Sequence, residues 1–80
     1  MATLRLFASA REAAGTGRVA MAGDTVGDIL DSAVATFGRQ FADVLVTCRV
    51  WVNGDEADRT TTVSANDEVA VLPPVSGGCR

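Results

Sequence analysis

The residues best suited to chemistry lie near the end of the sequence, where a hydrophobic run meets two prolines and then two glycines. This segment reads Val71-Leu72-Pro73-Pro74-Val75-Ser76-Gly77-Gly78-Cys79-Arg80. Proline cannot donate to a sheet ladder and keeps the chain extended, and glycine carries no side chain. Such a tail suits threading into a narrow channel of another protein, where a backbone carboxyl group is modified. We therefore expect a folded domain over residues 1–75 and a thin flexible tail over residues 76–80.

Composition limits the chemistry that the folded part can supply. Of the 80 residues, 48% are hydrophobic, which is enough for one small core without a metal or a disulfide. Histidine and lysine are absent, so histidine catalysis, histidine metal ligation and a lysine Schiff base are excluded within this sequence. The two cysteines, Cys48 and Cys79, are too few for an iron–sulfur cluster. We expect no metal site and no cofactor bound by the chain itself.

Charge and hydropathy indicate where the protein works. The net charge is −3 and the seven arginines are scattered along the sequence, which argues against nucleic acid or an anionic membrane as partner. The N-terminal residues lack the apolar core of a signal peptide, and no stretch approaches the length of a membrane span. We expect a cytoplasmic protein, where a reducing environment disfavours a Cys48–Cys79 disulfide.

Hydrophobic periodicity predicts the first half of the fold. Leu4 and Leu6 alternate with other residues over 2–7, which predicts a strand, and a turn at 15–17 lets residues 18–22 return as the second strand of a hairpin. Thr25 and Gly38 are the expected N-cap and stop of a helix. Its apolar face comprises Val26, Ile29, Leu30, Ala33, Val34 and Phe37.

The second half of the sequence adds strands. Residues 39–47 favour a short helix or an irregular connection, residues 48–53 alternate as a strand, and residues 68–72 form the final strand after a turn at 64–67. A short strand fits between the last two. This order packs best as one mixed sheet of about five strands over one main helix. We therefore predict an α+β protein with the β-grasp, ubiquitin-like fold.

The same alternation predicts an apolar cluster on the face of the sheet that points away from the helix. If Leu4, Val50 and Val69 face inward, then Phe7, Trp51 and Leu72 emerge together outside, with Ala70 between them. Clustered exposed aromatic and aliphatic side chains mark protein interfaces. The alternative is that residues 39–47 fold over the cluster. The predicted partner-binding residues are Phe7, Trp51, Leu72, Pro73, Pro74 and Val75.

Several segments together resemble the MoaD/ThiS family of ubiquitin-like sulfur carrier proteins, over nearly the whole sequence. They are Leu6-Phe7-Ala8, Arg11-Glu12, Gly15, Val52-Asn53-Gly54, Asn66-Asp67-Glu68-Val69 and Leu72-Pro73-Pro74-Val75-Ser76-Gly77-Gly78. The part from Asp67 to Gly78 is most similar to the small subunit of molybdopterin synthase. The resemblance implies a protein cosubstrate and not an enzyme.

The resemblance also implies a site and partners. In the family, an adenylating partner uses ATP to activate the carboxylate of the last glycine, here Gly78 preceded by Gly77, which then becomes a thiocarboxylate. The implied sulfur acceptor is an enzyme such as the large subunit of molybdopterin synthase or a cysteine synthase-like enzyme. Molybdenum cofactor, cysteine, another thiolated metabolite and a siderophore all remain possible destinations.

Cys79 and Arg80 depart from the usual family ending, because they lock Gly78 in an amide. Some similar carriers end Gly-Gly-Cys-X, and a zinc metalloprotease removes the extension, so we expect cleavage between Gly78 and Cys79. A second route is attack of the Cys79 thiol on the Gly78 carbonyl, although nothing in the sequence strains that peptide. The alternative function is a ubiquitin-like binding or modifier module without sulfur chemistry.

Overall fold

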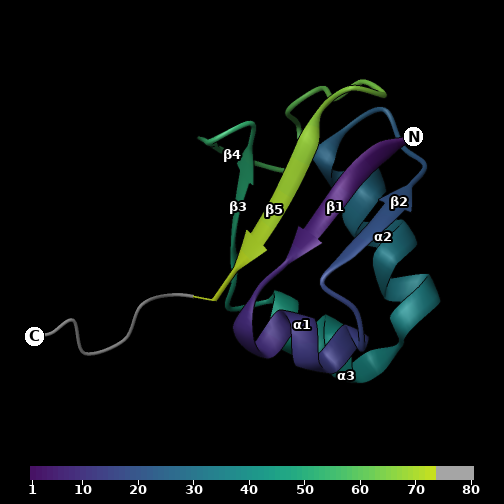
Figure 1. The fold of residues 1–80 in the computed structure, drawn as a ribbon, viewed down its shortest axis with the longest axis vertical. Helices are drawn as coiled ribbons and strands as arrows, with labels where there is room; N and C mark the ends of the chain where they lie inside the picture. The colour runs from purple at the N-terminus through teal and green to yellow at the C-terminus, as the bar shows by residue number, and fades with distance from the viewer. Residues whose placement is uncertain (74–80) are drawn as a thin grey trace, which may run out of the picture.

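Five strands form one mixed sheet, and the main helix lies against one of its faces (Figure 1). The computed structural model describes residues 1–73. In chain order the elements are β1 (Ala2–Leu6), α1 (Ala8–Ala14), β2 (Arg18–Met21), α2 (Val26–Phe37), α3 (Arg39–Leu45), β3 (Arg49–Val52), β4 (Asp55–Ala57) and β5 (Glu68–Leu72). No helix within these residues is long and apolar enough to span a membrane.

Strand β5 occupies the centre of the sheet, whose order is β2-β1-β5-β3-β4. It runs parallel to β1, with Leu4 beside Val69, and antiparallel to β3, with Val50 beside Val71. Strands β1 and β2 pair antiparallel, and so do β3 and β4. This arrangement confirms the predicted mixed sheet of five strands.

Helix α2 begins and ends where the sequence predicts. The Thr25 side-chain oxygen accepts a hydrogen bond from the backbone N–H of Asp28 at 3.2 Å, which satisfies one of the free donors of the first turn. At the other end, the Gly38 N–H donates to the carbonyl of Val34 at 2.9 Å. The helix therefore has a fixed length and presents one apolar face to the sheet.

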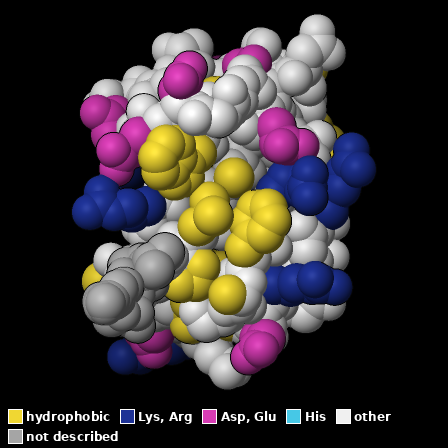
Figure 2. Space-filling model, turned by 60° about the vertical axis from the view of Figure 1, so that its left-hand side comes forward, with side chains coloured by type: hydrophobic (Ala, Val, Ile, Leu, Met, Phe, Trp, Pro, Cys, Tyr) yellow, Lys and Arg dark blue, Asp and Glu magenta, His cyan; other side chains and the backbone are white. Residues whose placement is uncertain are grey.

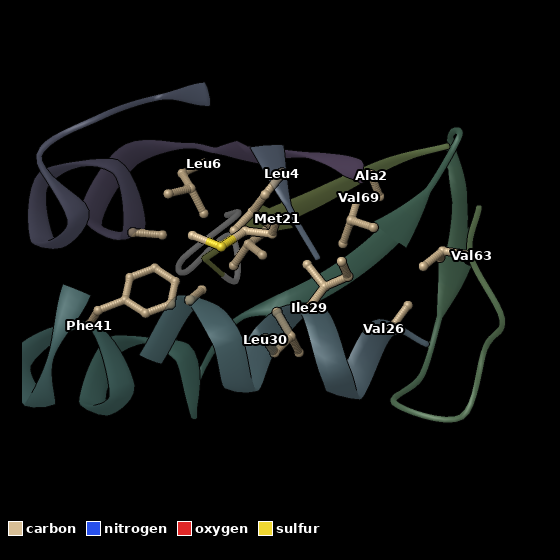
Figure 3. Packing of buried hydrophobic residues seen from close by; sticks show 13 residues of the cluster. Ala2, Leu4, Leu6, Met21, Val26, Ile29, Leu30, Phe41, Val63 and Val69 are labelled. Atoms are coloured by element: carbon tan, nitrogen blue, oxygen red, sulfur yellow. The ribbon is translucent and has the colours of Figure 1, made fainter. Parts of the chain in front are cut away.

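The core lies between the sheet and this face of α2 (Figure 3). Leu4 and Val69 point from the sheet toward Ile29 of α2, and Phe41 of α3 closes the core at one end. All four side chains are fully buried, and each such burial stabilises the fold by about 1.5–3 kcal/mol. Buried polar side chains are absent from residues 1–73, so the core depends on apolar packing.

Two helices lie at the end of the sheet where β1 and β5 finish, and the sequence patterns predicted neither with certainty (Figure 1). Residues 39–47, expected as a short helix or an irregular connection, contain α3. Helix α1 was not expected, because seven residues are too few to display a helical period and Ala10 alone is fully buried. Its signals are the alanine-rich composition and Gly15, whose φ of 78° ends the helix. The predicted hairpin is therefore an antiparallel pair joined through a helix.

Candidate functional site

Strand β5 carries the chain from the middle of the sheet toward its C-terminal segment. Because β5 pairs with β1 on one side and β3 on the other, its exit point is held more firmly than that of an edge strand. The strand ends at Leu72, and Pro73 is the last described residue. The predicted carrier and processing residues lie outside the described residues: Gly77, Gly78 and Cys79. The same is true of two predicted partner-binding residues, Pro74 and Val75.

The predicted apolar cluster lies on the outer face of the sheet beside this exit. A hollow of about 650 Å³ lies here, and we call the five apolar residues of its lining the outer apolar face: Phe7, Trp51, Ala70, Leu72 and Pro73. The hollow has a simple origin, because Ala70 on the central strand lies directly between Trp51 and Arg5 and contributes a single methyl group. Figure 2 shows hydrophobic side chains gathered on one face, with arginines at its borders.

The outer apolar face is open among the described residues. Phe7 is 38% exposed, and Trp51, Leu72 and Pro73 are half-buried. The alternative that residues 39–47 cover this face is wrong, because α3 packs against α1 and α2 and buries Phe41 completely. Exposed aromatic and aliphatic groups beside the chain exit are the expected features of a docking surface.

Two ion pairs border the outer apolar face. The Arg49 guanidinium lies 2.7 Å from the Glu56 carboxylate, and that of Arg5 lies 3.4 Å from Glu68. The Arg5 guanidinium carbon also lies 5.5 Å from the centre of the Phe7 ring, which is a cation–π geometry. Because all of these groups are substantially exposed, each pair contributes at most about 1 kcal/mol to stability. Their main effect is to place positive and negative charges at the border of the outer apolar face.

Three arginines meet on the other side of Phe7, which the sequence analysis did not anticipate. Arg5, Arg11 and Arg18 line one cleft of about 410 Å³ together with Phe7 and the turn residues Thr16 and Gly17. The description of the arginines as scattered is therefore wrong for these three. The pairing of β1 with β2 and the fold of α1 bring together charges that lie far apart in sequence.

Cys48 is part of the core edge and not a reactive site. Its side chain is half-buried against the core, and Sγ donates a hydrogen bond to the carbonyl of Val44 at 3.3 Å. Burial raises the pKa of the Cys48 thiol above its ordinary value, so it remains protonated at neutral pH. The interpretation of Cys48 as a small buried hydrophobic residue agrees with this environment.

Asp67 and Glu68 have separate structural roles and do not form a catalytic acid pair. One Asp67 carboxylate oxygen accepts from the Asn53 side chain at 2.9 Å, and the other accepts from the Ser64 N–H at 2.8 Å. Asp67 thus closes the turn before β5 and ties it to the β3–β4 turn. These hydrogen bonds lower the pKa of the Asp67 carboxyl, and the bond from Asn53 has the largest effect. Glu68 instead pairs with Arg5.

We predict that Asp67 makes the stability of the fold depend on acid. Its pKa is lower in the folded than in the unfolded chain, so its contribution is complete above about pH 4, the ordinary aspartate value. As the pH falls through the lowered folded-state pKa, that contribution is lost. Urea unfolding of Asp67→Asn should show a destabilisation at pH 7 that shrinks in strong acid. The control is Asp43→Asn, an exposed carboxylate on α3; an equal pH dependence for both variants would contradict the prediction.

Taken together, the mixed five-stranded sheet and the core that packs it against α2 define a β-grasp, ubiquitin-like protein, with the outer apolar face beside the exit of its central strand. More narrowly, the chain belongs to the ThiS family, whose family model matches residues 4–78. Members of this family serve as small ubiquitin-like protein cosubstrates and not as enzymes. The expected resemblance to MoaD/ThiS proteins is thereby confirmed.

Named relatives support the assignment. The chain is 43% identical to small archaeal modifier protein 1 of Haloferax volcanii, covering 92% of this chain and 97% of the relative. The crystal structure of that protein superimposes with a TM-score of 0.77 at 37% identity, over 95% of this chain and 97% of the other. The solution structure of small archaeal modifier protein 1 from Methanosarcina acetivorans gives a TM-score of 0.80 at 29% identity, over 96% and 95% of the two chains.

A more distant neighbour shows the same fold. The crystal structure of Mycobacterium tuberculosis CysO gives a TM-score of 0.80 at 19% identity, over 94% of this chain and 100% of the other. At this level of identity the likeness is evidence for the fold alone. The β-grasp architecture predicted from the order of strands and helix is therefore confirmed by relatives at several levels of sequence identity.

Proposed function

We propose that this protein is a sulfur carrier that holds sulfur as a thiocarboxylate on Gly78. In this proposal the peptide bond between Gly78 and Cys79 is first cleaved, and a partner enzyme then adenylates the Gly78 carboxylate with ATP. The observation that carries the proposal is the extent of the family match, which runs through the glycine pair and stops at Gly78, before Cys79 and Arg80. The chain itself binds no cofactor, since ATP is used by the partner.

The chemistry requires little from the carrier. Hydrolysis of the Gly78–Cys79 bond adds water and leaves a free carboxylate, one oxygen of which attacks the α-phosphorus of ATP and displaces pyrophosphate. Hydrosulfide from a reduced sulfur donor then attacks the acyl carbon and AMP leaves, which gives the thiocarboxylate. Glycine suits this sequence because no side chain obstructs the acyl carbon inside an enzyme channel. The anionic sulfur finally attacks an electrophilic substrate in an acceptor enzyme.

The outer apolar face is the proposed docking surface for both enzymes. Phe7, Trp51, Leu72 and Pro73 line one hollow directly at the exit of β5, so a partner bound there also receives the segment that follows. Pro74 and Val75 extend the same contact in the proposal. The tail then reaches the partner's catalytic centre because the sheet, rather than the tail, supplies the binding energy.

The partners follow from the three steps. A metalloprotease removes the residues after Gly78, an adenylating enzyme activates Gly78, and an acceptor takes the sulfur. Candidate acceptors are the large subunit of molybdopterin synthase and a cysteine synthase-like enzyme. Nucleic acid and membrane have no part in these steps. Because the reactions need ATP and a reduced sulfur donor, we place them in the cytoplasm.

The second candidate is protein modification, which the name of the 43%-identical relative favours, since that relative is a modifier protein. The same Gly78 adenylate would be attacked by a lysine amine of a target protein, so that an isopeptide bond forms and AMP leaves. This sequence contains no lysine, so the protein cannot build lysine-linked chains of itself. The two candidates share activation of Gly78 and differ in the nucleophile.

One experiment separates the candidates. The chain ending at Gly78 is incubated with its adenylating enzyme, ATP and sulfide, with and without extract from its own cells. We expect a product that is retarded on a gel containing an organomercurial, as thiocarboxylates are, and that is absent for a control chain ending at Gly77. Conjugates of higher mass that resist thiol reduction, without the retarded product, would favour the modifier and contradict the carrier.

A further inference from the structure

The cleft formed by Arg5, Arg11 and Arg18 is a separate feature from the outer apolar face, which it adjoins at Phe7. Its shape depends on the turn between α1 and β2. A Cβ atom on Gly17 would lie 3.2 Å from Nε and 3.6 Å from the guanidinium carbon of Arg11, so the missing side chain leaves room for the Arg11 head group. The Thr16 hydroxyl contacts both the N–H and the carbonyl of Arg18, which fixes that residue at the cleft.

This cluster is unfavourable for stability. Arg5 on β1 and Arg18 on β2 are direct cross-strand partners, and like charges directly opposite one another destabilise a sheet. Arg5 is partly compensated by Glu68 at 3.4 Å. Among residues 1–73, neither Arg11 nor Arg18 forms an ion pair, whereas Arg39, Arg49 and Arg59 each pair with a carboxylate. Local conflict of this kind in an otherwise consistent fold is typical of a binding site.

We infer that this arginine cleft binds an acidic segment of the partner protein that docks on the outer apolar face. The partner's apolar side chains occupy the outer hollow, and its carboxylates pair with Arg5, Arg11 and Arg18. Phe7 lines both hollows, so one continuous segment can reach them together. The inference rests on the proposed function for the identity of the partner, which is an enzyme that receives Gly78.

Charge complementarity identifies this occupant. Three guanidinium groups in one cleft favour carboxylates, in a chain whose net charge is −3. The C-terminal segment of this chain supplies no carboxylate side chain, because residues 74–80 contain neither aspartate nor glutamate. The adjoining apolar face favours a protein segment over a free anion, since a free anion has no use for an apolar contact.

The test is an NMR titration of the full-length protein with a short peptide of glutamates around one leucine. A matched peptide has glutamine in place of every glutamate. We expect the glutamate peptide to shift the backbone amides of Arg5, Phe7, Arg11 and Arg18, and to bind about tenfold more tightly than the glutamine peptide at low salt. Added salt should reduce this difference, because the paired groups are near the surface.

The variant Arg18→Glu separates binding from stability. It replaces a like-charge pair with an opposite-charge pair, so we expect a higher denaturation midpoint together with about tenfold weaker binding of the glutamate peptide. Arg39→Glu makes the same charge change on α3, outside the cleft, and should bind the peptide as the wild type does. Equal peptide affinity for Arg18→Glu and wild type would overturn the inference. The inference would also be overturned if tripolyphosphate shifted the same backbone amides and reached saturation at a lower concentration than the peptide, because that result would indicate a site for free anions.

The inference and the proposed function fail differently. If the glutamate peptide binds the cleft but the chain ending at Gly78 is never adenylated, the cleft is supported and the proposed function is contradicted. If that chain is adenylated and converted to the thiocarboxylate, and Arg18→Glu binds its adenylating enzyme with unchanged affinity, the proposed function is supported and the inference is overturned.

Discussion

A chain that ends at Gly78 will be adenylated by its partner enzyme, whereas the chain that continues through Arg80 will not. The reason is chemical, because the Gly78 carbonyl in the longer chain belongs to an amide and has no carboxylate oxygen to attack ATP. The free carboxylate of the longer chain lies on Arg80, two residues beyond the glycine pair, and arginine carries a long charged side chain where glycine carries none. We expect adenylation above background for the chain ending at Gly78 and only background adenylation for the chain ending at Arg80.

Pyrophosphate exchange measures this prediction directly. The two chains are compared with the same adenylating enzyme and ATP, together with the control chain ending at Gly77. A binding measurement on both chains is included, since the outer apolar face is identical in the two and should bind with similar affinity. Equal exchange by the chains ending at Gly78 and Arg80 would show that removal of Cys79 and Arg80 is not needed for activation.

The second large effect is expected from Trp51→Ala. Trp51 lines the outer hollow opposite Ala70 and takes no part in the buried core, so its loss should affect binding more than folding. Central aromatic anchors of interfaces typically contribute 2 kcal/mol or more, so we expect roughly 30-fold weaker binding to the adenylating or the acceptor enzyme. The free energy of unfolding should fall by about 1 kcal/mol, as for a half-buried cross-strand residue.

Val46→Ala is the matched control for Trp51→Ala. Val46 is 84% exposed and follows α3, away from the outer apolar face, so it removes exposed hydrophobic surface without touching the proposed docking site. Isothermal titration with each enzyme and urea unfolding give the two quantities for both variants. Unchanged affinity of Trp51→Ala for both enzymes would refute the docking role of the outer apolar face.

The features predicted correctly from the sequence are those with a strong local signal. Helix α2 repeats its apolar residues over three turns between a threonine cap and a glycine stop, so its bounds follow from the sequence. The outer apolar face follows from the two-residue period of strands, which places Trp51 on the opposite side of the strand from Val50 and Val52, the two partly buried valines that pack against the core. Both features depend on residues close together in sequence.

The features that were missed depend on tertiary structure. Helix α1 is too short to show a period, and it forms where its alanines pack beside α3. The arginine cleft requires the pairing of β1 with β2, which places Arg5 against Arg18 although thirteen positions separate them. A tally of charges along the sequence shows scattered arginines, and only the register of the strands reveals the cluster. The role proposed for Gly78 rests on family resemblance, because Gly78 lies outside the described residues.

The central claim is that Gly78 carries sulfur, and the intact mass of the protein isolated from its own cells tests it most directly. The protein is purified without reducing or alkylating agents and measured by mass spectrometry. We predict a species that ends at Gly78 with one oxygen replaced by sulfur, which would establish processing and sulfur loading together. A protein found only as the full chain through Arg80, under conditions in which the sulfur-requiring pathway is active, would contradict the claim.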